Sequence, residues 1–395
     1  MVKQGYKQTE IGVIPEDWEV IPLSNVFSYI SYGFTNPMPT TNSGPWMVTA
    51  NDVKNGRINY ETARKTSEYA FKKLITDKSR PKIGDLLLTK DGTLGRVAIV
   101  DKSNICINQS VAVIRTNDKI EVNFLKHLLQ DNFYQKVMIE NAGGSTIKHI
   151  YITVVDKMPI VLPPLPEQEA IAEALSDADA WIESLEQLIA KKRLIKQGAM
   201  QELLTPPSPS SGNADGEALE PWEVKKLGEM SIIYTGKKNN QDKIENGKYP
   251  FFVRSQTVER INSYSFNGEA ILIPGEGNLG SIVHYINGKF DFHQRVYKIS
   301  GFTGLHGRFL YFYFRMYFGT HAMQNTVKAT VDSIRLPTLE EFIIKFPSLS
   351  EQTRIATILS DMDAELETLE QQLDKAQQIK QGMMQELLTG RVRLV

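Results

Sequence analysis

Two segments of the chain share one pattern of apolar and polar positions. Their apolar residues recur at alternating spacings of four and three, which is typical of helices that pack along a coiled-coil seam. The seam positions are Ile171, Leu175, Ala178, Ile182, Leu185 and Ile189 in the first segment, and Ile355, Leu359, Met362, Leu366, Leu369 and Leu373 in the second. The pattern therefore predicts two long helices that pack on each other.

The two segments belong to an internal repeat, which has to be recognised before a fold is assigned. Residues 163–205 and 347–389 align without a gap, and 26 of the 43 aligned positions are identical. Smaller correspondences at nearly the same offset pair Leu94-Gly95 with Leu279-Gly280, Gln109 with Gln294, and Phe124-Leu125 with Phe309-Leu310. Trp18 and Trp222 mark the start of each copy. The chain therefore consists of two copies of one repeat.

Charge along the two helices predicts their relative direction. Residues 167–186 carry acidic side chains and no basic one, and the basic residues of the first helix follow later. The second helix also places most of its acidic residues before Lys375 and Lys380. This order suits each helix dipole, and only an antiparallel pair sets acidic halves against basic ones. We therefore expect antiparallel packing.

Each predicted helix contains one glycine, Gly198 or Gly382. A glycine inside a helix costs about 1 kcal/mol relative to alanine. We therefore expect a kink or a close helix contact at these two positions.

The sequence outside the helices predicts mixed α/β blocks. Short runs of β-branched or alternating residues predict strands, and Asn-Gly pairs predict tight turns. The expected strands are 46–50, 85–89, 97–100, 111–115, 270–274, 281–286 and 296–299, the expected turns are Asn55-Gly56, Asn246-Gly247, Asn267-Gly268 and Asn287-Gly288, and the expected short helices are 123–140 and 307–323. Residues 206–217 are rich in proline and serine, which predicts a flexible linker.

Composition and charge narrow the class of protein. With 395 residues, of which 41% are hydrophobic, the chain can bury the cores of two or three domains, and this excludes a disordered or fibrous protein. The formal net charge is −1, but residues 1–160 and 221–345 are net basic. This distribution suits the binding of a polyanion by the two large blocks. The sequence shows no signal peptide or membrane span, so we expect a soluble cytoplasmic protein.

The sequence contains one weak match to a motif of dinucleotide-binding enzymes. Gly275-Glu276-Gly277-Asn278-Leu279-Gly280 matches G-x-G-x-x-G, but a strand-like run follows it where a dinucleotide site requires a helix. We therefore interpret it as a turn. No Walker, zincin or nucleophile-elbow motif is present, and the six histidines lack metal-ligand spacing. Cys106 is the only cysteine, and we expect a buried structural thiol.

The repeated motifs resemble the specificity subunit of type I restriction-modification systems. The resemblance is carried by PPLPEQ at 163–168, by QELLT at 201–205 and 385–389, and by GYKQTEIGVIPEDW at 5–18. It covers nearly the whole chain. One departure is the segment 206–217, where members of that family continue with a basic, glycine-containing stretch such as 389–393.

The resemblance implies an α+β fold with a pseudo-twofold internal repeat. Two mixed α/β target recognition domains are separated by two long helices that form an antiparallel coiled coil. The corresponding division of the chain is 1–160 for target recognition domain 1, 161–205 for spacer helix 1, 206–220 for the flexible linker, 221–345 for target recognition domain 2, and 346–395 for spacer helix 2.

The resemblance also implies a function. A specificity subunit binds double-stranded DNA at an asymmetric bipartite target, and it positions two methylation subunits and, through the complex, the restriction subunits. It is not itself an enzyme, and S-adenosylmethionine, ATP and Mg²⁺ belong to the partner subunits. The residues leave one alternative open, a two-headed coiled-coil adaptor that binds nucleic acid or protein without base specificity.

Candidate contact residues follow from residue type and position. Base edges and phosphates are contacted by basic, amide and hydroxyl side chains on exposed loops. The candidates are Lys90, Thr93, Ser145, Thr146, Lys148 and His149 in the first block, and Arg254, Gln256, Asn278, Arg295, Lys328, Thr330 and Ser333 in the second. On the first helix, Trp181, Leu188 and Leu194 lie outside the seam and are candidates for partner binding, since exposed apolar groups commonly mark an interface.

Overall fold

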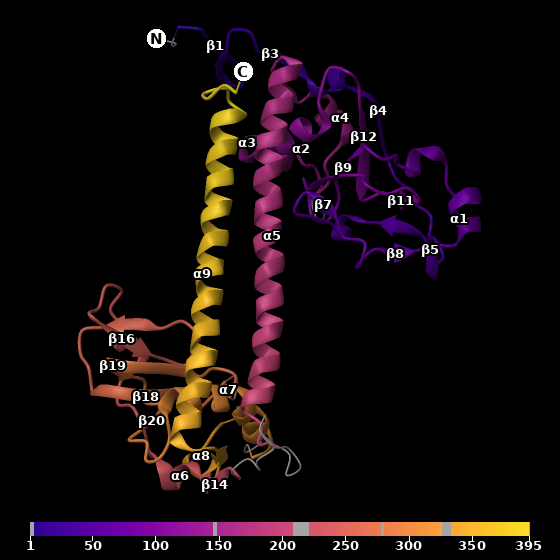
Figure 1. Cartoon of the computed structure of the whole chain (residues 1–395). Coiled ribbons are helices and arrows are strands. Elements are labelled where there is room, and N and C mark those ends of the chain that lie inside the picture. Colours follow the sequence, from indigo (N-terminus) through magenta and orange to yellow (C-terminus); the bar gives the residue numbers. More distant parts are fainter. Residues whose placement is uncertain (1–3, 145–147, 208–220, 278–279, 326–332, 395) are drawn as a thin grey trace, which may run out of the picture. The chain divides into compact units, whose positions relative to one another are not determined.

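The chain folds into two compact units, and both long helices contribute to each of them. The computed structural model describes residues 4–144, 148–207, 221–277, 280–325 and 333–394. Unit 1 consists of Met1–Leu185 and Gln372–Val395, and unit 2 consists of Glu186–Gln371. The division falls within helix α5 (Leu165–Leu203) and within helix α9 (Leu349–Leu387) (Figure 1). Each unit therefore contains chain from both copies of the repeat.

Unit 1 consists of small sheets and four short helices beside its parts of α5 and α9. Its strands are β1 (Tyr6–Thr9), β2 (Gly12–Pro15), β3 (Glu19–Pro22), β4 (Phe27–Tyr32), β5 (Thr41–Val48), β6 (Val53–Lys54), β7 (Arg57–Ile58), β8 (Arg64–Lys65), β9 (Leu86–Thr89), β10 (Val97–Ile99), β11 (Ile105–Ile107), β12 (Val111–Thr116) and β13 (Pro159–Leu162). Its short helices are α1 (Glu68–Lys73), α2 (Val122–Gln130), α3 (Asn132–Glu140) and α4 (Ile152–Lys157). The central sheet is antiparallel with the order β10-β9-β12-β4, β11 joins β5 in parallel, and β13 pairs with β3.

Unit 2 repeats this plan with a larger sheet. Its strands are β14 (Glu223–Lys226), β15 (Ile232–Thr235), β16 (Tyr249–Phe252), β17 (Glu259–Ile261), β18 (Phe266–Pro274), β19 (His284–Phe292), β20 (Val296–Ser300) and β21 (Ile343–Phe346). Its short helices are α6 (Leu227–Met230), α7 (Gly307–Gln324) and α8 (Leu336–Glu340). The sheet order is β15-β20-β18-β19-β16-β17, with β16 and β19 parallel, and β14 pairs with β21 as β3 does with β13.

In unit 1 the start of α5 packs against the end of α9. Ile171 and Leu175 of α5 are fully buried in the same core as Leu387 of α9. A polar contact accompanies this packing, because Asp179 of α5 accepts hydrogen bonds from Lys380 of α9 and from Lys126 of α2. The two helices therefore run antiparallel within this unit.

In unit 2 the end of α5 packs against the start of α9. Leu359 of α9 is fully buried in one core with Leu204, just beyond the end of α5. The basic half of α5 faces acidic residues of α9, with distances of 2.6 Å for both Lys192–Glu365 and Arg193–Glu370. The predicted antiparallel pairing and its charge complementarity are confirmed within each unit.

The turns predicted at Asn267-Gly268 and Asn287-Gly288 are wrong. Both pairs lie inside the antiparallel ladder of β18 and β19, where Gly268 stands directly opposite Gly288. Both glycines have φ near +150°, a conformation that side chains with a Cβ rarely adopt. The two glycines therefore form a cross-strand pair inside the sheet and do not reverse the direction of the chain. By contrast, Asn55-Gly56 does turn the chain between β6 and β7.

At Gly198 and Gly382 the expectation of a close helix contact is wrong. Helices α5 and α9 continue through both glycines. A Cβ atom added at either position would have no heavy atom of another segment within 4 Å. Neither glycine is required by the packing of its helix.

The described residues bear on the expectations for Cys106 and for a membrane span. Cys106 is fully buried in β11, and burial raises its pKa to about 12, so it is a structural thiol as predicted. Among the described helices, none combines the length and apolar character that a membrane crossing requires.

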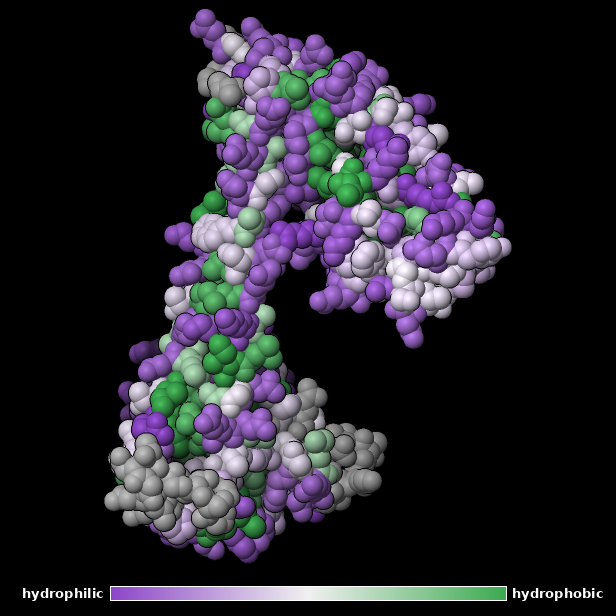
Figure 2. Space-filling model, turned by 45° about the vertical axis from the view of Figure 1, so that its right-hand side comes forward, coloured by the Kyte–Doolittle hydropathy of each residue, from purple (hydrophilic) through white to green (hydrophobic). Residues whose placement is uncertain are grey.

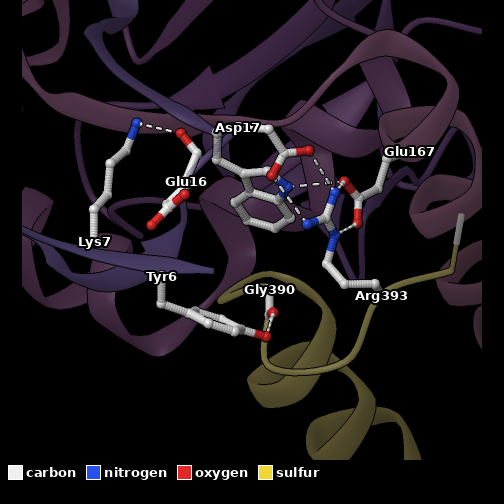
Figure 3. A network of polar contacts seen from close by, with 8 residues as sticks. Tyr6, Lys7, Glu16, Asp17, Glu167, Gly390 and Arg393 are labelled. Carbon is white, nitrogen blue, oxygen red and sulfur yellow. Dashed lines mark hydrogen bonds and ion pairs between the residues drawn. The ribbon is translucent and has the colours of Figure 1, made fainter. Parts of the chain in front are cut away.

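A buried carboxylate joins three distant segments in unit 1 (Figure 3). Glu167, at the start of α5, has no exposed side-chain surface. It accepts a hydrogen bond of 2.8 Å from the Trp18 indole and is paired with the Arg393 guanidinium. Arg393 also forms a two-pronged contact with Asp17, at 2.7 and 3.0 Å, and hydrogen bonding to Asp17 and Glu167 raises the pKa of Arg393. Nearby, the Tyr6 hydroxyl donates to the carbonyl of Gly390 at 2.9 Å.

Replacing Gly198 or Gly382 with alanine is expected to stabilise the protein. Each substitution should raise the free energy of unfolding by about 0.5–1 kcal/mol, because alanine removes the entropic cost of a helical glycine and meets no neighbour. Urea unfolding followed by circular dichroism measures this change. Gly33→Ala is the control, since its Cβ would lie 1.8 Å from the Ile107 carbonyl oxygen and should destabilise the fold. Unchanged or lower stability in both helix variants would contradict the prediction.

Replacing Arg393 with alanine is expected to destabilise unit 1. The change leaves the buried Glu167 carboxylate without its cationic partner, which typically costs about 3–5 kcal/mol. Differential scanning calorimetry of the full chain should show a transition shifted to lower temperature. The matched control is Arg391→Ala, because Arg391 pairs only loosely with the exposed Glu386 at 3.6 Å and such pairs contribute under about 1 kcal/mol. Equal shifts in the two variants would show that the Glu167 contact is unimportant.

Candidate nucleic-acid interface

In each unit three loops meet at one edge of the central sheet. The strands β4, β12 and β9 are neighbours and antiparallel, so the last residues of β4 and β9 lie beside the first residues of β12. The same holds for β15, β20 and β18. We define loop 1 as residues 33–38 and 236–241, loop 2 as 108–110 and 293–295, and loop 3 as 90–93 and 275–277 in units 1 and 2, respectively.

Loops 1 and 2 are joined by the same backbone hydrogen bond in both units. The amide of Gln109 donates to the carbonyl of Phe34 at 2.9 Å in unit 1. The amide of Gln294 donates to the carbonyl of Lys238 at 2.8 Å in unit 2. Both glutamine residues are exposed at the tip of loop 2.

Loops 2 and 3 are also joined in the same way. The amide of Lys90 donates to the carbonyl of Ser110 at 2.9 Å, and the amide of Gly275 donates to the carbonyl of Arg295 at 2.8 Å. The two units therefore present different side chains on one backbone framework.

A glycine at the start of loop 1 permits the close approach of loop 2. A Cβ atom on Gly33 would lie 1.8 Å from the carbonyl oxygen of Ile107, and one on Gly236 would lie 2.0 Å from that of Phe292. Any larger residue would separate the two loops. The framework thus depends on glycine at the same place in both units.

In unit 1 all three loops border a concave surface with a volume of about 890 Å³, and in unit 2 loops 1 and 2 border one of about 500 Å³. Amide side chains are frequent in both linings: Asn36, Asn51, Asn108 and Gln109 in unit 1, and Asn239, Asn240, Gln241 and Gln294 in unit 2. Asn and Gln are the side chains that pair in a bidentate manner with adenine in the major groove. The surfaces have the chemistry needed to contact base edges.

Basic side chains of the lining, His149 in unit 1 and Arg254 and Arg295 in unit 2, are paired with a carboxylate of loop 3. In unit 1, Asp91 contacts Lys90 at 3.0 Å and His149 at 2.7 Å. In unit 2, Glu276 contacts Arg254 at 3.0 Å and also pairs with Arg295.

A neutral histidine supports loop 2 of unit 2. Burial lowers the pKa of His293, and the neighbouring Arg254 and Arg295 lower it further. The unprotonated Nδ1 atom of His293 accepts a hydrogen bond of 3.0 Å from the amide of Arg295. This contact fixes the backbone from which the Arg295 side chain extends.

The structure brings together only some of the candidates derived from the sequence. Lys90 and His149 meet in unit 1, Arg254 and Arg295 meet in unit 2, and Ser333 forms a β-bridge with Glu276 in loop 3. Thr93 has a structural role as well, because its hydroxyl donates to the carbonyl of Ala50 at 3.1 Å. Lys148 and Gln256 are exposed but do not line the concave surfaces. Ser145, Thr146, Asn278, Lys328 and Thr330 lie outside the described residues.

The amides of loops 1 and 2 were not among the candidates predicted from the sequence. Their only signal in the sequence is the identity of Gln109 and Gln294, which correspond at an offset of 185 residues. Loop residues have no periodicity, so their convergence on one surface becomes visible only in the fold.

The proposed partner-binding residues on α5 are exposed. The exposed fractions are 45% for Trp181, 38% for Leu188 and 69% for Leu194. Figure 2 shows hydrophobic surface in patches along the helices. These side chains are available for contact with another protein.

Comparison with known proteins gives one consistent family. The model of the family described as "Type I restriction modification DNA specificity domain" matches residues 15–192 and 219–380. A protein of Methanocaldococcus jannaschii, assigned as the MjaX type I restriction enzyme specificity subunit, is 26% identical over 99% of this chain and 97% of its own length. The EcoDI specificity subunit of Escherichia coli is 33% identical over 42% of this chain and 37% of its own length.

Solved structures agree with this comparison at the level of the fold. The type I restriction-modification S subunit from M. genitalium gives a TM-score of 0.67 at 19% identity, covering 94% of this chain and 96% of that one. A chain from a structure concerned with complex assembly and conformational transition of the type I R-M system gives a TM-score of 0.53 at 17% identity, with coverage of 96% and 99%.

Proposed function

The chain belongs to the family of type I restriction-modification DNA specificity proteins, and on this basis we propose that it reads an asymmetric bipartite DNA target. Each unit binds one half of the target through its three loops. The observation that supports this proposal is the repeated loop framework, which presents different side chains in the two units. Two surfaces that share a backbone framework but carry different side chains are suited to two different half-sites.

The side chains available fit the known chemistry of base recognition. Arginine and lysine pair with guanine, and asparagine and glutamine pair with adenine, while further basic groups contact phosphates. Unit 2 offers Arg254 and Arg295, whereas unit 1 offers Lys90 and His149 at the border of an amide-lined surface. The two half-sites should therefore differ in sequence.

We further propose that the chain is a non-catalytic subunit that positions methylation and restriction subunits on the bound DNA. Methylation and cleavage, with S-adenosylmethionine, ATP and Mg²⁺ as cofactors, then belong to those partners. The exposed apolar side chains of α5, including Trp181, support this assignment, since such groups on a helix commonly mark an interface.

Replacing Trp181 with aspartate is expected to weaken assembly with the methylation subunit. A charge at the centre of an apolar contact should lower the amount of methylation subunit that copurifies by about tenfold or more, because aromatic anchors often contribute 2 kcal/mol or more to binding. The thermal unfolding of the free chain should change little, since the Trp181 side chain is half exposed. Tyr69→Asp is the matched control, because Tyr69 is an exposed aromatic residue of α1. Normal copurification of the Trp181 variant would show that the α5 surface around Trp181 does not bind the methylation subunit.

The bipartite target can be tested with a map of methylated bases. The genome of a strain that carries the chain with its partner subunits should show methylation within two different short sequences separated by a nonspecific gap. A strain without the chain should lack these methylated sites. A palindromic or continuous site would contradict the proposal, and methylation without sequence preference would favour a nonspecific adaptor.

A further inference from the structure

One carboxylate occupies the same place on loop 3 in both units. Asp91 and Glu276 follow β9 and β18 at an offset of 185 residues. Each forms a β-bridge with a residue just before a short helix: Asp91 with His149, before α4, and Glu276 with Ser333, before α8. The positions are therefore structurally equivalent, although the neighbouring side chains differ.

Each carboxylate binds two basic side chains. The Asp91 carboxylate contacts the Lys90 ammonium and the His149 Nδ1 atom. One oxygen of Glu276 accepts from Arg254, and the other accepts from Arg295. In unit 2 the Glu276 carboxylate is 22% exposed, whereas the Arg254 and Arg295 side chains are 44% and 52% exposed. In unit 1 the exposed fractions are 19% for Asp91, 17% for Lys90 and 40% for His149.

Affinity for DNA does not account for these carboxylates. A negative charge at a surface that binds DNA repels the phosphates, and each pairing neutralises cationic charge that would otherwise favour binding. Loss of the carboxylate should therefore leave nonspecific binding unchanged or stronger. Its recurrence at the same place in two units with different side chains indicates a role other than attraction.

Orientation is the role that the contacts support. Free arginine and lysine side chains are rotationally flexible, and fixing them before binding reduces the entropic cost of recognition. In unit 2 the pairing engages one nitrogen of each guanidinium, and a guanidinium carries five N–H donors. Donors thus remain available for the O6 and N7 atoms of guanine, which arginine contacts in a bidentate manner.

We propose that Asp91 and Glu276 are positioning residues that determine sequence discrimination, each for the half-site bound by its own unit. They hold the paired basic side chains in the orientation that contacts guanine. This inference rests on the proposed function, since it requires that each unit reads one half of a bipartite target.

The test is selection of DNA by the full chain in complex with its methylation subunit. The probe is a duplex library with a randomised central window, and the bound fraction is sequenced. Wild type should enrich two half-sites. Glu276→Gln should reduce the preference at the G·C positions of one half-site by about tenfold and leave the other half-site unchanged. Asp91→Asn should do the reverse, with total binding equal or stronger in both variants.

Matched controls separate positioning from general charge effects. Glu259→Gln in unit 2 and Glu68→Gln in unit 1 also remove a paired carboxylate, from Lys243 and Lys72 respectively, away from the three loops. Both should retain the wild-type preferences. Glu276→Asp keeps the charge but shortens the side chain, so loss of the same preference in this variant would identify position as the cause. Thermal unfolding of every variant confirms that it is folded.

Some outcomes would overturn the inference while the proposed function stands. Wild-type preferences that persist in Glu276→Gln and Asp91→Asn would do so, as would an equal loss at both half-sites in either variant. If the wild-type complex enriched no sequence, the proposed function itself would fail. The two failures are therefore distinguishable in one experiment.

Discussion

The antiparallel pairing of α5 and α9 is the constraint from which the rest of the structure follows. Since α5 is acidic in its first half and basic in its second, and α9 begins with an acidic stretch, only opposed helices set the basic half of α5 against the acidic start of α9. The start of one helix must then pack beside the end of the other, which places Ile171 with Leu387 in unit 1 and Leu359 with Leu204 in unit 2. Each unit consequently needs a part of both copies, because the larger core of each unit combines residues of both.

Within this arrangement the protein separates its framework from its chemistry. Backbone hydrogen bonds and the glycines Gly33 and Gly236 fix the three loops, and the same bonds occur in both units. The amide side chains of the loops can differ between the units, because none of those backbone bonds depends on them, whereas Thr93 and His293 make side-chain contacts that support their own loops. Under the proposed function, such a division would allow the DNA target to change by substitution in the loops while the fold is retained.

The sequence predicted the features that have a period or a charge gradient. Both long helices and their direction could be derived, because seam residues such as Leu175 and Leu359 recur regularly and because the basic half of α5 complements the acidic start of α9. Asn-Gly pairs were ambiguous, since glycine also suits the cross-strand pair of Gly268 and Gly288. The amides around Gln109 in unit 1, and those around Gln294 in unit 2, could not be grouped from the sequence into the surface that each set forms. Loop residues come together only after distant strands have paired.

The composition of unit 1 also sets an order of events during synthesis. Unit 1 begins first on the chain but requires residues 372–395, which the ribosome makes after the whole of unit 2. Domains generally fold from the N-terminus onward as they emerge, yet here the second unit can be completed while the first still lacks the Arg393 contact to Glu167. Until residues 372–395 are made, the core that Leu387 and Leu388 complete lacks these two residues. A prematurely terminated chain would therefore carry a finished second unit and an unfinished first one.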